Sequence, residues 1–149
     1  MILLTHEHGS YFRYKDADLY FKITGNLNGK PLLMIHGGLQ CMMDLDAIYK
    51  SIPPSYKLIL VDLRGHGKST LGNAELSYQQ YQQDIEALLA YLHLSRVSVF
   101  GFSDGGIVGY RLALSEKIQV SRLITLGAQW RLQEKDSARD MLSSVTIAD

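Results

Sequence analysis

Four predominantly apolar runs along the chain lack the alternation of a half-buried strand: Pro31–Ile35, Tyr56–Val61, Val97–Phe102 and Leu123–Leu126. Runs of this kind are typical of strands that are covered on both faces. Ala17–Thr24 instead alternates, with Leu19, Phe21 and Ile23 on one side. Together with Tyr11–Tyr14 it predicts an antiparallel hairpin at a sheet edge.

Helical periodicity lies between these strands. Ser77-Tyr78-Gln79-Gln80 has the form of a capping box, and apolar residues then recur at helical spacing from Tyr81 to Leu92. Asp44–Lys50 and Gly105–Glu116 are predicted as further helices. Strands that alternate with helices form right-handed βαβ units. The predicted fold class is therefore α/β, a three-layer sandwich around a mostly parallel sheet of about six strands.

The composition argues against several classes of binding partner and cellular location. The 149 residues fit one domain, 15 basic residues balance 15 acidic ones, and no Lys/Arg cluster provides a footprint for nucleic acid or an anionic membrane. No run is long enough to span a membrane, and the N-terminal residues lack the features of a signal peptide. We expect a soluble, cytoplasmic protein. The single cysteine, Cys41, excludes an internal disulfide framework and a cysteine-based zinc site.

Candidate chemistry follows three of the predicted parallel strands, because active sites of such sheets lie at the carboxyl ends of the strands. The loops are His36-Gly37-Gly38-Leu39, Asp62-Leu63-Arg64-Gly65-His66-Gly67-Lys68-Ser69 and Gly101-Phe102-Ser103-Asp104-Gly105-Gly106. The third is a Gly-x-Ser-x-Gly pattern between a strand and a helix, which predicts a nucleophile elbow, a tight strand-to-helix turn with Ser103 at positive φ. A Cβ at Gly101 or Gly105 would collide with neighbouring backbone, and the Ser103 hydroxyl would stand at a helix N-terminus.

In these three loops, each placed after a strand, the chain resembles the α/β-hydrolase family, and within it the lid-bearing esterases, lactonases and aminopeptidase-like enzymes. The resemblance covers about residues 9–127 and implies that Ser103 is a nucleophile. It further implies an oxyanion hole formed by the backbone N–H of Asp104 with that of Gly38 or Leu39. His36, Gly37, Gly101 and Gly105 are then supporting residues, and His36 lies behind the oxyanion loop.

The chain also departs from this family. The family places the acid and the histidine of its triad on later strands of an eight-stranded sheet, whereas no histidine follows His93 here. We therefore expect residues 1–149 to be the N-terminal part of the α/β-hydrolase core, with residues 129–149 beginning a lid. The alternative is a half-fold that works without a triad.

Other side chains have structural interpretations that compete with functional ones. His66 is expected to be a turn residue, although it could serve as a substitute base if it reached Ser103. The Asp104 carboxylate is expected to cap the following helix. His6 and His8 are assigned to an exposed N-terminus, and Tyr78 to packing or surface. Cys41 is read as an inert small hydrophobic residue.

The sequence thus predicts a serine hydrolase of an ester, lactone, amide or peptide bond that works through an acyl-enzyme, with a small-molecule substrate. No nucleotide cofactor is expected, because neither the phosphate-loop nor the dinucleotide spacing is complete. The resemblance to the α/β hydrolases further implies no cofactor and no metal, since such enzymes use only the protein's own groups. The competing hypothesis is a non-catalytic module that binds a partner or itself. Strand 122–126 would be an exposed apolar edge, which predicts either a homo-oligomer formed through it or a tail, residues 129–149, that folds back over it.

Overall fold

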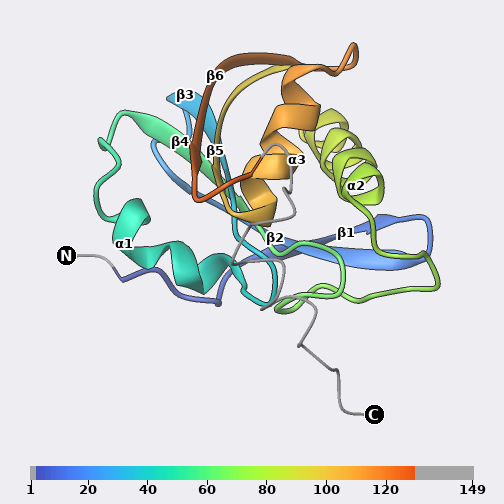
Figure 1. Ribbon diagram of the computed structural model, residues 1–149. Helices are drawn as coiled ribbons and strands as arrows, with labels where there is room; N and C mark the ends of the chain where they lie inside the picture. Colours follow the sequence, from blue (N-terminus) through green and yellow to red (C-terminus); the bar gives the residue numbers. More distant parts are fainter. Residues whose placement is uncertain (1–2, 130–149) are drawn as a thin grey trace.

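The computed structural model describes residues 3–129 and arranges them around one six-stranded sheet (Figure 1). The strands are β1 (Ser10–Tyr14), β2 (Ala17–Gly25), β3 (Lys30–Ile35), β4 (Tyr56–Val61), β5 (Arg96–Phe102) and β6 (Gln119–Leu126). Their order across the sheet is β1-β2-β4-β3-β5-β6. The predicted antiparallel hairpin at the sheet edge is confirmed, and so is the mostly parallel remainder, since β4, β3, β5 and β6 pair in parallel.

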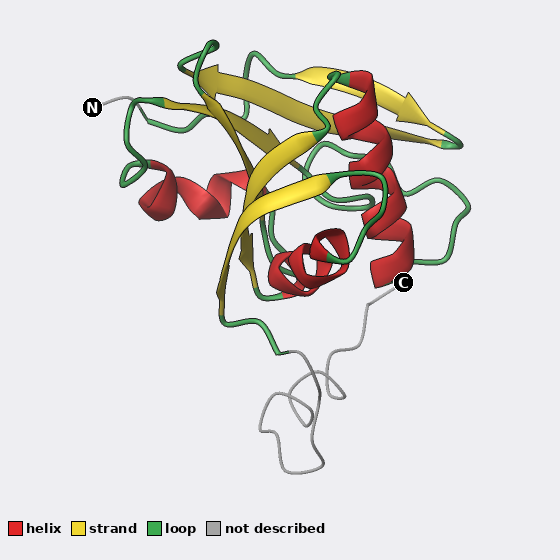
Figure 2. Ribbon diagram, turned by 90° about the horizontal axis from the view of Figure 1, so that it is seen from above, coloured by secondary structure: helices red, strands yellow, loops and turns green. Residues whose placement is uncertain are grey.

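Two faces of the sheet are covered, as the apolar runs predicted. The helical elements are η1 (Met42–Leu45), α1 (Asp46–Tyr49), α2 (Tyr78–Tyr91) and α3 (Asp104–Ala113). Helices α2 and α3 lie on one face and the η1–α1 segment on the other (Figures 1 and 2). Successive strand residues separate accordingly: Leu33 and Ile35 pack under α2 and α3, while Leu32 and Met34 pack under η1. This three-layer arrangement confirms the predicted fold class.

Element boundaries differ from the sequence prediction at three places. The segment predicted as one helix over Asp44–Lys50 is a 3-10 turn followed by a four-residue α-helix. Helix α3 ends at Ala113, short of the predicted Glu116. Strand β6 begins at Gln119 rather than Leu123, because its first residues pair with Arg96 and Val97 of β5 across a bulge. For β6, pairing with β5 moved the start of the strand to a position that the local apolar pattern did not mark.

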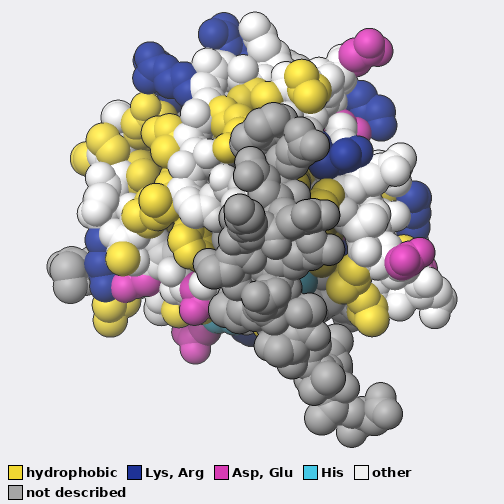
Figure 3. Space-filling view, in the orientation of Figure 1, with side chains coloured by type: hydrophobic (Ala, Val, Ile, Leu, Met, Phe, Trp, Pro, Cys, Tyr) yellow, Lys and Arg dark blue, Asp and Glu magenta, His cyan; other side chains and the backbone are white. Residues whose placement is uncertain are grey.

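Strand β6 is the edge of the sheet within residues 3–129, and it pairs there with β5 alone. Ile124 is 64% exposed and Leu126 is 49% exposed. Figure 3 shows apolar side chains gathered on the side of the molecule where β6 lies. The predicted self-association through this edge has a physical basis in these residues and stays a prediction. The predicted lid region lies, from residue 130 on, outside the described residues. No helix in the described part of the chain is long and apolar enough to cross a bilayer.

Candidate active site

A sharp turn places Ser103 between the end of β5 and the start of α3. Its backbone has φ 49° and ψ −116°, a left-handed conformation that non-glycine residues seldom adopt. The Ser103 N–H donates to the carbonyl of Leu126 at 2.8 Å, which ties the turn to the end of β6. The prediction of a tight strand-to-helix turn with positive φ is therefore confirmed.

Glycines on both sides of Ser103 allow the turn to close. A Cβ at Gly101 would lie 2.3 Å from the carbonyl oxygen of Gly105, inside α3. A Cβ at Gly105 would lie 2.3 Å from the carbonyl oxygen of Ile35, at the end of β3. Both contacts involve backbone, which cannot move aside cheaply, so the predicted reason for these two glycines is confirmed.

The loop after β3 lies directly against the turn. A Cβ added to Gly37 would stand 3.2 Å from the Ser103 Cβ, and one added to Gly38 would stand 2.3 Å from Oδ2 of Asp104. Leu39 adopts φ 58°, and its side chain is exposed. Among residues 3–129, the N–H groups of Gly38, Leu39 and Asp104 donate no hydrogen bond. These are the donors that the family resemblance assigns to the oxyanion hole.

The His36 side chain lies beneath the loop after β3 and connects it to the loop after β4. It is fully buried; its Nε2 accepts from the N–H of Leu63 at 2.9 Å, and its Nδ1 lies 2.6 Å from the carbonyl of Gly37. Since Nε2 accepts, the proton is on Nδ1, and the imidazole is neutral. Burial lowers the pKa of His36, and the bond to the Gly37 carbonyl opposes that shift only in part. These contacts are those of the supporting role expected behind the oxyanion loop.

Asp104 does not cap α3 with its carboxylate, so that expectation was wrong. Oδ1 instead accepts from the hydroxyl of Tyr78 at 2.8 Å, and Oδ2 faces Gly38. The two helices meet here, because Tyr78 is the first residue of α2 and Asp104 the first of α3. Burial and the neighbouring carboxylate raise the pKa of Tyr78. A tyrosine assigned to packing is therefore part of the surroundings of Ser103.

The Ser103 hydroxyl makes no hydrogen bond to any residue within 3–129, and no histidine in that range contacts it. His66, the substitute base considered from sequence, has its Nδ1 3.0 Å from the carbonyl of Arg64 and its ring against those of His36 and Tyr81. It is the turn residue that was expected. Burial raises the pKa of Tyr81 to about 12, so this neighbour stays protonated at neutral pH.

Two features near the site were missed from sequence. His6 is not part of an exposed terminus: its Nε2 lies 2.5 Å from Oδ2 of Asp62, a carboxylate that is fully buried. Arg64 is also fully buried and forms a two-pronged ion pair with Asp84, at 2.8 and 2.9 Å. His8, by contrast, is exposed as expected. In the sequence, only the many polar residues of the loop after β4 point to these interactions, and they do not indicate which residues Asp62 and Arg64 would bond.

Comparison with known proteins identifies hydrolases that share this fold. A family model described as the alpha/beta hydrolase fold matches residues 30–144. A human serine hydrolase-like protein is 30% identical over 124 residues, covering 82% of this chain and 61% of that protein. A proline iminopeptidase from Xylella fastidiosa is 31% identical over 136 residues, covering 85% of this chain and 42% of that protein.

Solved structures show the same architecture. A hydrolase from Pseudomonas aeruginosa superposes with a TM-score of 0.81 at 23% identity, covering 94% of this chain and 53% of that one. At this level of identity the likeness concerns the fold. The chain thus spans between about two fifths and three fifths of the length of these three proteins. The range that the family model matches contains the loops after β3, β4 and β5.

Proposed function

We propose that this chain, which belongs to the α/β hydrolase family, carries the nucleophile and oxyanion hole of a serine hydrolase. The observation that carries the proposal is the conformation of Ser103. Its hydroxyl has no partner within residues 3–129, and it stands on a left-handed turn at the N-terminus of the ten-residue helix α3. A left-handed backbone at a non-glycine residue costs about 1–3 kcal/mol and is concentrated at functional sites.

The proposed reaction uses the chain's own groups. The Ser103 oxygen attacks the carbonyl carbon of an ester, lactone, amide or peptide bond while a base takes its proton. The negative oxygen that forms is held by the N–H of Asp104 and that of Gly38 or Leu39, aided by the positive end of α3. Collapse of the intermediate expels the leaving group, which receives the proton, and water then releases the acyl group from Ser103.

The base and the acid of the triad are assigned to residues outside 3–129. The three histidines in the loops around the site form hydrogen bonds to residues other than Ser103. His36 bonds to Leu63, His66 to Arg64 and His6 to Asp62. An unassisted serine hydroxyl is a poor nucleophile at neutral pH. We therefore expect residues 1–149 alone to turn over p-nitrophenyl acetate only weakly. Strong turnover that is lost in Ser103→Ala would place the base within residues 1–149 and contradict this expectation.

Fluorophosphonate labelling tests the nucleophile, because the reagent reacts with a serine that is activated by a base. A form of the protein that extends past Asp149 is expected to be labelled at Ser103, and Ser103→Ala is expected to remove the label. Ser98→Ala is the matched control: Ser98 lies on β5, the strand that leads to Ser103, and its hydroxyl is 3.1 Å from that of Ser121.

Two results would overturn this assignment. Labelling that persists in Ser103→Ala would put the nucleophile elsewhere. An extended protein that folds but stays unlabelled would instead favour a non-catalytic module, which binds a partner or a second copy through the β6 edge.

A further inference from the structure

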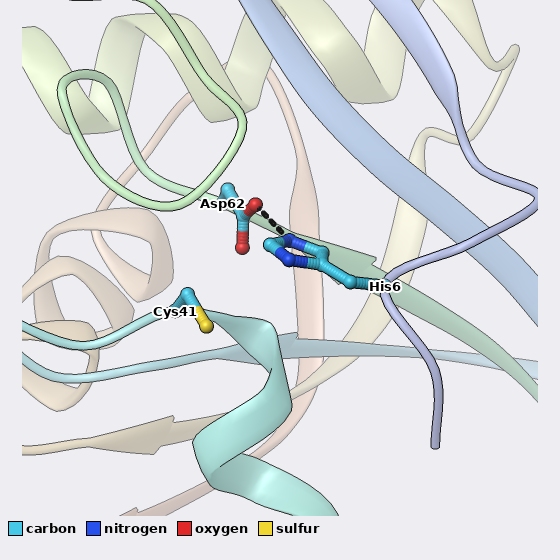
Figure 4. Close-up of side chains that lie close together, drawn as sticks. All are labelled: His6, Cys41 and Asp62. Atoms are coloured by element: carbon cyan, nitrogen blue, oxygen red, sulfur yellow. Dashed lines mark hydrogen bonds and ion pairs between the residues drawn. The ribbon is translucent and has the colours of Figure 1, made fainter.

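Three side chains of metal-ligand type meet beside the oxyanion loop: His6 from the segment before β1, Cys41 from the loop after β3, and Asp62 from the end of β4 (Figure 4). One nitrogen, one sulfur and one oxygen of these residues lie within 4.8 Å of one another. The side chains turn toward a common space between the three segments (Figure 4). They are separated widely in sequence, so no spacing motif indicates the cluster. A metal site at this cluster would depart from the sequence-based expectation of no metal and of an inert Cys41.

We propose that His6, Cys41 and Asp62 bind a divalent transition-metal ion of the zinc class. Imidazole nitrogen, thiolate sulfur and carboxylate oxygen are the three donor types that zinc uses in proteins. Metal–ligand distances of about 2.0–2.3 Å put the donor atoms of a tetrahedral site about 3.5 Å apart. The present separations require the His6–Asp62 pair to open and Cys41 to approach, each on the order of 1 Å. The fourth position is left for water.

The ligands are held by neighbours that would serve as an outer shell. Asp62 is oriented by two backbone donors, Met42 N–H to Oδ1 and Lys68 N–H to Oδ2, both at 2.8 Å. The His6 carbonyl accepts from the Tyr20 hydroxyl at 2.8 Å, which fixes the backbone that presents the imidazole. Such outer contacts orient ligands and reduce the cost of forming the site.

Charge and proton balance are consistent with a dication. Binding displaces the thiol proton of Cys41 to solvent. The proton on His6 Nε2, which the ion replaces, moves to Nδ1, so that the imidazole binds as a neutral ligand. One thiolate and one carboxylate then neutralise the ion, which suits a half-buried position. The bound ion would join the N-terminal segment and the end of β4 to the loop that begins with the oxyanion donors.

One cation opposes the site. The Lys68 ammonium donates to the His6 carbonyl and lies 5.1 Å from the centre of the Tyr20 ring. Its charge raises the free energy of a dication bound nearby. Removing that charge while keeping the length of the side chain, in Lys68→Met, is therefore expected to tighten binding.

The single cysteine gives a direct readout, because a thiol reagent such as Ellman's reagent reports Cys41 alone. The experiment uses the reduced 149-residue chain without a histidine tag, with Zn²⁺ as the probe. Zinc is expected to slow the reaction of Cys41 at least tenfold, and a chelator to restore it. His6→Gln, which keeps a donor for Asp62, is expected to abolish the protection. The matched control is His8→Gln, two residues away and exposed, which is expected to retain it.

Equilibrium dialysis provides the second measurement. One zinc ion per wild-type chain is expected, with none on Cys41→Ala and tighter binding to Lys68→Met. Circular dichroism establishes that each variant is folded. Equal protection of Cys41 in wild type and His6→Gln would overturn the proposal, as would an unchanged ion on Cys41→Ala or the lack of any protection in wild type. None of these outcomes depends on whether Ser103 is a nucleophile.

Discussion

The loops after β4 and β5 are both rich in polar and glycine residues, yet they use their polar groups in opposite ways. In the loop after β4, Asp62, Arg64 and Ser69 are buried and each has several partners. In the turn after β5, within residues 3–129, the Ser103 hydroxyl and the Asp104 N–H make no hydrogen bond. A satisfied buried group stabilises the fold, whereas a group that must bind substrate has to be left without an internal partner.

In the loop after β4, the Arg64 side chain has a structural role. Its guanidinium bonds both oxygens of Asp84, Oδ1 of Asp16 and the carbonyls of Leu71 and Tyr14. This one side chain thereby connects the β1–β2 hairpin, α2 and its own loop. The geometry raises the pKa of Arg64, with the Asp84 carboxylate as the first cause. The loop after β4, one of the three loops that resemble α/β-hydrolase motifs in sequence, therefore uses Arg64 to hold neighbouring elements together.

Arg64→Leu is expected to have the largest effect on stability. It leaves the Asp84 carboxylate buried without its partner, and breaking a buried ion pair from one side costs about 3–5 kcal/mol. Urea denaturation followed by circular dichroism measures the loss. The control is Arg13→Leu, which removes an exposed ion pair with Asp18 and is expected to cost less than about 1 kcal/mol. Similar losses for the two variants would contradict the assigned role of Arg64.

Gly105→Ala tests the turn itself. Its new Cβ would press on the backbone of Ile35 and His36, and overpacking of this kind costs about 1–3 kcal/mol. Gly109→Ala, one turn later in α3, meets side chains and no backbone: the end of Leu123 at 2.8 Å, which can move, and Val99 at an ordinary contact distance of 3.5 Å. It is expected to be nearly neutral. Thermal unfolding compares the two. If both variants unfold at the wild-type temperature, there is room for a methyl group between α3 and β3, and the steric role assigned to Gly105 is wrong.

The two serines provide the sharpest form of the comparison. Ser69 donates to the carbonyl of Asp62 at 2.6 Å and accepts from the N–H of Tyr20 at 2.8 Å, so Ser69→Ala is expected to cost about 1–3 kcal/mol. Ser103→Ala removes a hydroxyl without a partner in the described residues and is expected to change stability by less than about 0.5 kcal/mol. Urea denaturation of both variants checks this, and the reverse ranking would refute the contrast.

The pH dependence of stability is expected to show a smaller effect from His36. Its pKa is lowered from 6.5 in the folded state, so the unfolded chain binds the proton more readily. The stabilisation is complete above pH 6.5 and decreases as the pH falls toward the folded pKa, because the unfolded chain then takes up a proton that the buried ring, with Nε2 bonded to the N–H of Leu63, does not. Denaturation curves between about pH 8 and pH 5 measure this decrease in stability. His36→Gln is expected to flatten this part of the profile, and an equally steep profile would assign it to another histidine.

Much of the fold was predictable because it depends on neighbours in sequence. Apolar runs placed the strands, and Gly101, Ser103 and Gly105 placed the turn. The errors share one cause. The carboxylate of Asp104 was expected to bond the adjacent helix, but Tyr78, 26 residues away, is its partner. His6 was assigned to the surface, but Asp62, 56 residues away, bonds it.

What the sequence by itself determined is therefore the alternation of strands and helices and the strained turn at Ser103. Both follow from side-chain pattern and from the conformations that glycine permits over a few residues. Only the tertiary structure decided which polar groups are paired. It joined Arg64 to Asp84, Tyr78 to Asp104, and His6 to Asp62 beside Cys41. Partner choice depends on the packing of distant segments, because a buried polar group bonds whatever the fold brings within reach.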